Sequence, residues 1–280
     1  MVRPKLFLDT NTCVNVANGK VEPVEWRRVQ KYINTNYRYC ISFITLKELL
    51  SKVARGSHEY FERNKGPLQV LRAPTKPRFL VYPTVFALRT ILGIKSVTRT
   101  GTSGLPEEEW AGRVLEAVLD APSKAQLKNG IPVRNRRRRM QSFDLDEFDV
   151  SENEPQNQHA ELLQGIREGR IDMPEPEKWA AWILHQHELT PYTEACQKLT
   201  VMLDAAYRFS YSLSKMAKDK GYDYKAHASD WGDSTQLFYL CDEQMHFLTF
   251  DDDFRHRTKG SSQSSRILFY PEFIASIGIT

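Results

Sequence analysis

The sequence predicts an α/β protein with a central, mostly parallel sheet and a mostly helical insertion. Residues 1–54 alternate twice between a short apolar strand and an amphipathic helix, which is typical of a parallel sheet. Another apolar strand, followed by aspartates, recurs near residue 250, whereas residues 101–189 have a helical and more charged pattern. We therefore expect residues 1–100 and 190–280 to form the core, and residues 101–189 to form the insertion.

The first four elements follow from apolar periodicity. Lys5–Leu8 and Tyr37–Ile41 are short apolar or aromatic runs and predict strands. Residues 23–33 place Trp26, Val29 and Ile33 on one face and predict a helix. The run from Thr45 to Glu48 matches a capping box, so a second helix is expected to begin there and reach about Ala54.

The remaining strands and helices have weaker sequence patterns. We expect strands over 78–82 and 266–269, and helices over 85–92, 106–119, 156–168, 175–187, 191–218 and 271–277. Within the insertion, a basic run at 134–139 is followed by an acidic stretch, which predicts a charged loop at about 130–155. Opposite charges so close together are more often a solvated surface than a binding site, although such a basic run could also track phosphates.

One stretch, from Ser229 to Phe254, contains two groups of acidic residues. Asp230 and Asp233 open an apolar helix, and the aspartates of 251–253 follow a brief strand at 247–249. Ligands of open α/β sheets bind outside the carboxyl ends of the strands. Carboxylates gathered there repel one another unless protons or metal ions intervene.

Acidic residues also follow the two N-terminal strands. Asp9 comes directly after the first strand, and Glu48 lies shortly after the second. Together with Asp251 and either Asp230 or Asp233, they would form an all-oxygen site suited to one or two Mg²⁺ or Mn²⁺ ions. Two such ions can activate a water and stabilise both oxygens of a phosphodiester displacement.

Four segments, LFLDTN, SFITLKELL, SDWGDSTQLFYL and FLTFDDDF, resemble in order the motifs of the PIN-like nuclease family. The resemblance covers residues 1–55 and 190–280 and implies a PIN-like three-layer α/β fold that cuts RNA, sometimes DNA, with Mg²⁺ or Mn²⁺. It implies four catalytic carboxylates, namely Asp9, Glu48, Asp233 and Asp251. The alternative metal ligands next to them are Asp230 and Asp253. The insertion has no counterpart in these motifs, and bacterial toxins of the family are about half as long.

Several polar residues beside the expected site could contact substrate. Asn11 could orient a water or a phosphate oxygen without adding charge. Arg255, Arg257 and Lys259 could bind phosphates, although surface charge is the ordinary role of such residues.

The composition is compatible with a nucleic-acid partner. The net charge is +4 and the isoelectric point is about 8.8. No apolar run reaches the length of a membrane span and no secretory leader is evident, so we expect a cytoplasmic protein. An RNA substrate, or DNA, is the expected partner, and a protein inhibitor is compatible with a role as a toxin or defence effector. A dimer is also compatible with the sequence, which does not fix the oligomeric state.

Two other functions stay open from sequence. The Asp9–Thr12 run is one residue away from the motif of haloacid-dehalogenase-like phosphatases, in which Asp9 would become the phosphorylated nucleophile. Asn11 then replaces the usual general acid, and Glu48 has no role. A PIN-like scaffold that binds RNA or protein without cutting is the other alternative.

Overall fold

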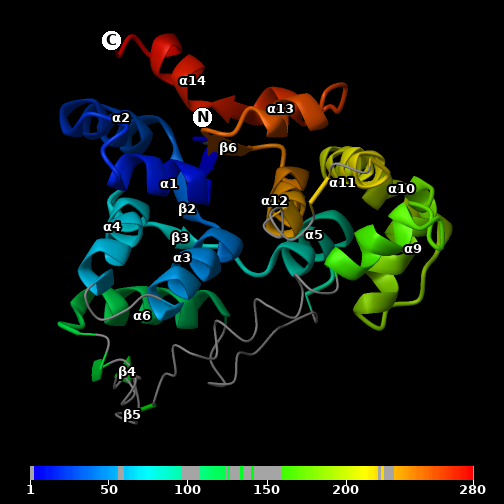
Figure 1. Ribbon diagram of the computed structural model, residues 1–280, viewed down its shortest axis with the longest axis horizontal. Helices are drawn as coiled ribbons and strands as arrows, with labels where there is room; N and C mark the ends of the chain where they lie inside the picture. The colour runs from blue at the N-terminus through cyan, green and yellow to red at the C-terminus, as the bar shows by residue number, and fades with distance from the viewer. Residues whose placement is uncertain are drawn as a thin grey trace.

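The computed structural model describes residues 3–55, 60–95, 107–123, 125–126, 133–134, 140–141, 159–219, 222–223 and 230–279 (Figure 1). Its centre is a five-stranded, wholly parallel sheet with strand order β3-β2-β1-β6-β7. The strands are β1 (Lys5–Leu8), β2 (Arg38–Ile41), β3 (Arg78–Phe79), β6 (Met245–Thr249) and β7 (Ile267–Phe269). The predicted α/β class with a parallel sheet is confirmed.

The sheet joins the two ends of the chain. β1 lies between β2 and β6, with Leu8 in register with Leu248. Side chains alternate between the two faces, so Leu6 and Leu8 join one hydrophobic core while Phe7 joins the other. Apolar residues on both faces are typical of a parallel sheet covered by helices on each side.

Helices cover both faces and make a three-layer arrangement (Figure 1). One layer contains α1 (Thr10–Ala17), α2 (Pro23–Asn36), α3 (Phe43–Arg55), α4 (Phe61–Arg72), α6 (Glu107–Asp120) and α14 (Tyr270–Ser276). The other contains α5 (Pro83–Leu92), α9 (Pro176–Gln186), α10 (Thr193–Met202), α11 (Asp204–Ala217), the 3₁₀ helix η2 (Leu237–Cys241) and α13 (Asp253–Arg257). The helix α12 (Asp230–Gln236) precedes η2, so the single helix expected there changes to 3₁₀ geometry after Gln236.

The helices of the expected insertion pack into the cores of the sheet. Val114 and Leu115 of α6 share a core with Leu6, whereas Trp179 of α9 shares the other core with Phe7. A further helix spans residues 159–167. Elsewhere in this region, β4 (Val133–Arg134) pairs antiparallel with β5 (Met140–Gln141). The remainder of the expected charged loop, including 135–139 and the acidic residues of 144–154, lies outside the described residues.

The single helix expected over 191–218 is wrong. Leu203 separates α10 from α11 and has non-helical backbone angles, φ −113° and ψ 17°. The buried side chain of Gln263 satisfies the interrupted backbone, since its amide donates to the carbonyls of Val201 and Met202 and its oxygen accepts from the N–H of Ala205. Because this partner comes from a distant segment, local periodicity could not reveal the break.

The capping box expected at Thr45 is also wrong. Helix α3 begins earlier, at Phe43, and the hydroxyl of Ser42 accepts a hydrogen bond from the N–H of Thr45 at 3.3 Å. Thr45 therefore lies inside the helix, where its hydroxyl is 3.0 Å from both the carbonyl oxygen of Leu8 and the side-chain oxygen of Gln236. Glu48 is consequently not needed to cap the helix.

Tyr239 is a buried polar link between the two halves of the chain. Its hydroxyl donates to the carbonyl of Val81 at 2.8 Å and accepts from the N–H of Phe43 at 3.2 Å. The side chain is completely buried, so no water can replace either partner. Val81 lies just beyond β3, which forms only the first two residues, Arg78–Phe79, of the strand expected over 78–82.

We expect Tyr239→Phe to lower the free energy of unfolding by about 1–3 kcal/mol, because a buried N–H and a buried carbonyl lose their partner. Chemical denaturation measures this change. Tyr192→Phe is the matched control, since Tyr192 is 55% exposed, and it should leave the stability unchanged. Equal stability of both variants would contradict the structural role of the Tyr239 hydroxyl.

Candidate functional site

The carboxyl ends of β1 and β6 bring two aspartates together. The N–H of Asp9 donates to the carbonyl of Leu248 at 3.0 Å, which continues the pairing of the two strands. The hydroxyl of Thr249 donates to Asp9 Oδ2 at 2.9 Å and accepts from the N–H of Asp251, also at 2.9 Å. One buried hydroxyl thus fixes Asp9 and the backbone of Asp251 relative to each other.

Glu48 approaches the same place from α3. The hydroxyl of Thr10, the first residue of α1, donates to Glu48 Oε2. On the other side lies Gly232 of α12, where an added Cβ would come within 2.5 Å of Glu48 Oε1. The absence of a side chain at residue 232 therefore allows α12 to approach the Glu48 carboxylate closely.

Asp233 is half-buried one position further along α12. Burial is the largest cause that raises its pKa well above the ordinary value, followed by the negative charges of Asp9 and Glu48 and then of Asp230 and Asp251. Asp233 therefore lies within electrostatic reach of the other three predicted catalytic carboxylates, Asp9, Glu48 and Asp251. The four residues come from four separate segments of the chain.

The same excess of negative charge affects the two strand-end aspartates. Burial raises the pKa of Asp9 to about 6, although the hydrogen bond from Thr249 opposes this shift, and the charge of Asp251 adds to it. Burial also raises the pKa of Asp251, against a hydrogen bond from the N–H of Asp253. These shifts indicate carboxylates whose charge is incompletely compensated by the protein.

Asp230 differs from Asp233 because it has a cation and a hydroxyl beside it. The hydroxyl of Tyr222 donates to Asp230 Oδ2 at 2.6 Å, and Arg257 Nη1 lies 3.4 Å from the same oxygen. Arg257 also pairs with Asp253 at 2.7 Å, and its side chain is only 9% exposed. The two alternative ligands, Asp230 and Asp253, are thus both paired with Arg257, which is itself engaged within the fold.

The other residues proposed for substrate binding have different surroundings. Arg255 forms ion pairs with Asp252 and Glu272 and stacks on Phe269, so it stabilises the segment after β6. Its hydrogen bond is the main cause that lowers the pKa of Asp252, which faces this cation and not the other carboxylates. Asn11 and Lys259 are exposed.

Sequence reasoning missed several residues that shape the site. Gln236 is fully buried, and its side chain favours the ionised form of Asp9, yet its amide nitrogen has no partner with hydrogen-bond geometry in the described part of the chain. The sequence does place Gln236 three residues after Asp233, on the same face of a helix, and this spacing could have indicated its proximity to the site. Thr249 and Gly232 appear in the same motifs, but their roles depend on contacts with Asp9 and Glu48 that only the fold supplies.

A residue of the expected insertion also reaches this region. Burial lowers the pKa of His159 to about 4, while the charge of Asp230 acts in the opposite direction. His159 is therefore neutral at physiological pH and lies within electrostatic reach of Asp230. The insertion thus contributes a side chain beside the candidate site.

The donor set agrees chemically with a hard divalent cation, because it consists of carboxylate oxygens. Within residues 3–279 as far as they are described, however, no three His, Cys, Asp or Glu side chains are grouped so that they could hold one metal ion. The carboxylates converge without forming a ready coordination sphere. Asp9, Glu48, Asp233 and Asp251 are the side chains that would have to close around an ion.

Comparisons with protein-family models, with curated proteins and with solved structures returned no match. None of the helices in the described ranges combines the length and apolar character needed to span a bilayer. A proposal for function therefore rests on the chemistry of the carboxylate group itself.

The raised pKa of Asp9 predicts a stability that falls as pH rises. The folded state holds the Asp9 proton up to about pH 6, whereas the unfolded chain releases it near pH 3.8. The free energy of unfolding therefore decreases between these two pH values and reaches its lower level above pH 6. Asp9→Asn removes the charge and keeps an acceptor for Thr249. We expect it to raise the free energy of unfolding by about 1–3 kcal/mol near neutral pH.

Denaturation of both proteins across this pH range, without divalent cations, measures the effect. The difference in the free energy of unfolding between wild type and Asp9→Asn should decrease towards acidic pH, where Asp9 is protonated in both the folded and the unfolded state. Asp252→Asn is the control and should give no gain, because Asp252 is already paired with Arg255. A pH-independent difference, or a less stable Asp9→Asn protein, would refute the assignment of the penalty to Asp9.

Proposed function

We propose that the protein is a metal-dependent endoribonuclease of the PIN-like type. The observation that carries this proposal is the convergence of Asp9, Glu48, Asp233 and Asp251 at the carboxyl end of a parallel sheet, where burial and the charges of the other three raise the pKa of Asp233. Grouping buried and half-buried carboxylates is costly for folding, and carboxylates with raised pKa values are typical of functional sites. A bound divalent cation would reduce this cost by neutralising the carboxylates.

The chain's own residues have distinct roles in this proposal. The four carboxylates hold one or two Mg²⁺ or Mn²⁺ ions, which supply an activated water and stabilise charge on the phosphate oxygens. Thr249 and Thr10 orient Asp9 and Glu48 through their hydroxyls. Arg257 neutralises Asp230 and Asp253 and keeps the segment after β6 in place.

The order of the strands supports the PIN-like assignment. Three of the resembling motifs lie at a strand end or in the helix that follows it, and the fourth forms α12 and η2, whose Asp233 lies within electrostatic reach of the other three carboxylates. The exposed amide of Asn11 lies beside this end and is available to a phosphate or a water. RNA is the proposed substrate, and a role as a toxin or defence effector belongs to the same proposal.

The phosphatase alternative is less well supported. Asp9 is 1% exposed and accepts a hydrogen bond from Thr249, whereas a nucleophilic carboxylate must reach a phosphorus atom. Glu48 and Asp233 would also have no role in that reaction. Trapping of an aspartyl-phosphate would favour this alternative over the nuclease.

Cleavage of single-stranded and structured RNA in the presence of Mn²⁺ tests the proposal. We expect the wild type to cut, and Asp9→Asn and Asp251→Asn each to lower the rate by about a hundredfold or more, because loss of a metal ligand should cost at least as much as loss of the residues that orient one. Removal of the metal with a chelator should abolish cleavage, and added Mn²⁺ should restore it.

Asp252→Asn is the matched control in the same triple-aspartate segment, and it should retain the wild-type rate. Equal rates for all four proteins would rule out the assigned carboxylates. A wild type that binds RNA but never cuts it would instead favour a non-catalytic scaffold.

A further inference from the structure

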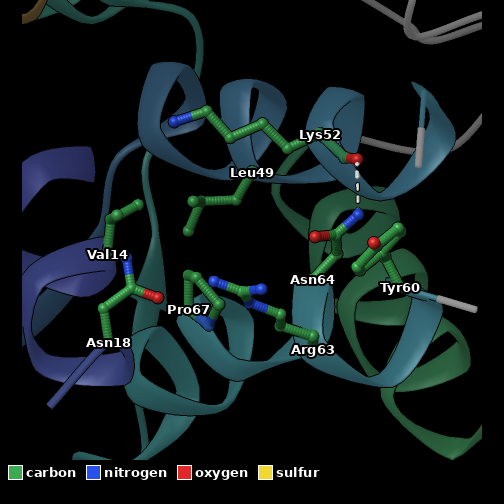
Figure 2. Close-up of a pocket in the computed structure, with 8 residues that line it drawn as sticks. All are labelled: Val14, Asn18, Leu49, Lys52, Tyr60, Arg63, Asn64 and Pro67. Carbon is green, nitrogen blue, oxygen red and sulfur yellow. Dashed lines mark hydrogen bonds between the residues drawn. The ribbon is translucent and has the colours of Figure 1, made fainter.

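A pocket with a volume of about 280 Å³ lies between α1, α3 and α4 (Figure 2). Its wall combines apolar, amide, aromatic and cationic side chains, all from the N-terminal part of the chain. These are Val14, Asn18, Leu49, Lys52, Tyr60, Arg63, Asn64 and Pro67. None of these residues belongs to the carboxylate group described above.

The pocket is basic and open to solvent. Lys52 and Arg63 are exposed, and among the residues that the structure describes neither forms an ion pair. None of the described residues that line the pocket is acidic. The guanidinium of Arg63 lies towards Pro67 and Leu49 in Figure 2, so the positive charge faces an apolar floor. Such a charge is available for an anionic ligand.

The other lining residues suit a flat, polar-edged group. Tyr60 is 52% exposed, which leaves its ring accessible for stacking. The side-chain nitrogen of Asn64 donates to the carbonyl of Lys52 at 3.2 Å, which fixes this amide across the pocket (Figure 2). Asn18 contributes a second amide from the end of α1. Amides can hydrogen-bond with the edges of a base.

The pocket begins about one helical turn from the carboxylates. Lys52 follows Glu48 by four residues on α3, a rise of about 6 Å, and Val14 follows Thr10 by the same interval on α1. The charges of Asp9 and Lys52 both act on the pKa of the buried Cys13 thiol, so a carboxylate of the site and a cation of the pocket lie within electrostatic reach of the same side chain. One strand could therefore contact the carboxylates and the pocket together.

We propose that this pocket binds one nucleotide of a single-stranded RNA, next to the phosphate that the carboxylates act on; the inference rests on the proposed nuclease function. Arg63 and Lys52 contact the phosphate backbone, and the base stacks on Tyr60 above the apolar floor of Leu49 and Pro67. Stacking combined with a positive groove is the usual way in which proteins hold single strands without strict sequence preference.

Equilibrium binding of a short fluorescein-labelled oligouridylate tests the inference. The parent protein is the full chain with the substitution Asp9→Asn, which suppresses cleavage during the measurement. Fluorescence anisotropy is recorded over a range of salt concentrations. We expect Arg63→Ala and Lys52→Ala each to weaken binding about tenfold at low salt. Each should also reduce the slope of log K against log salt by about 0.7, which is the contribution of one phosphate contact on a single strand.

Tyr60→Ala should weaken binding by about tenfold without changing that slope, whereas Tyr60→Phe should bind like the parent. Lys31→Ala, which removes an exposed cation from α2, is the matched control and should change neither quantity. All of these positions lie at the surface, so folding is expected to be unaffected, and circular dichroism checks it.

The inference is overturned if the three pocket variants bind like Lys31→Ala, or if the parent does not bind the oligonucleotide. RNA cleavage by the wild type with unaltered binding by the pocket variants would reject the pocket and leave the nuclease proposal intact. Pocket-dependent binding without any cleavage by the wild type would reject the hydrolytic function alone.

Discussion

Asp9 is buried and Asp233 half-buried at the end of the sheet, where burial and the charges of other carboxylates raise the pKa of both. Repulsion between these groups opposes folding, so the surrounding elements must hold them in place. The strand pairing of β1 with β6, the hydroxyl of Thr249 and the missing side chain at Gly232 all serve this end. The arrangement is stable only because two well-packed cores on either side of the sheet fix the elements that carry the carboxylates.

The ion pairs of the segment after β6 involve the aspartates at the edge of this group. Arg257 compensates Asp230 and Asp253, while Arg255 compensates Asp252. The pattern divides the aspartates into an outer set that forms ion pairs with arginines, Asp230, Asp252 and Asp253, and an inner set with raised pKa values, Asp9, Asp233 and Asp251. This division gives a physical reason to prefer Asp233 over Asp230, and Asp251 over Asp252, as proposed metal ligands.

The sheet and most helices could be predicted from sequence because their signals are local. Apolar runs defined β1 and β2, and the periodicity of α2 was clear. The single helix expected over 191–218 was wrong because a distant residue, Gln263, supports the break between α10 and α11. The start of α3 was also wrong, because Ser42 and not Thr45 caps this helix.

The same contrast holds for the candidate site. Its carboxylates could be named from sequence, since parallel strands bring their carboxyl ends to one edge. The partners that distinguish them, such as Tyr222 with Asp230, could not be named without the fold. The pocket beside Lys52 was also beyond sequence reasoning, because α1, α3 and α4 contribute to it jointly.

The central claim is that the inner carboxylates carry charge that a divalent cation neutralises. Isothermal calorimetry of the wild type with Mn²⁺ at neutral pH, alongside Asp233→Asn and the control Asp252→Asn, tests it most directly. The expected result is saturable binding by the wild type and by Asp252→Asn, and binding that is strongly weakened or lost in Asp233→Asn. Absence of Mn²⁺ binding by the wild type, or equal binding by all three proteins, would contradict the claim.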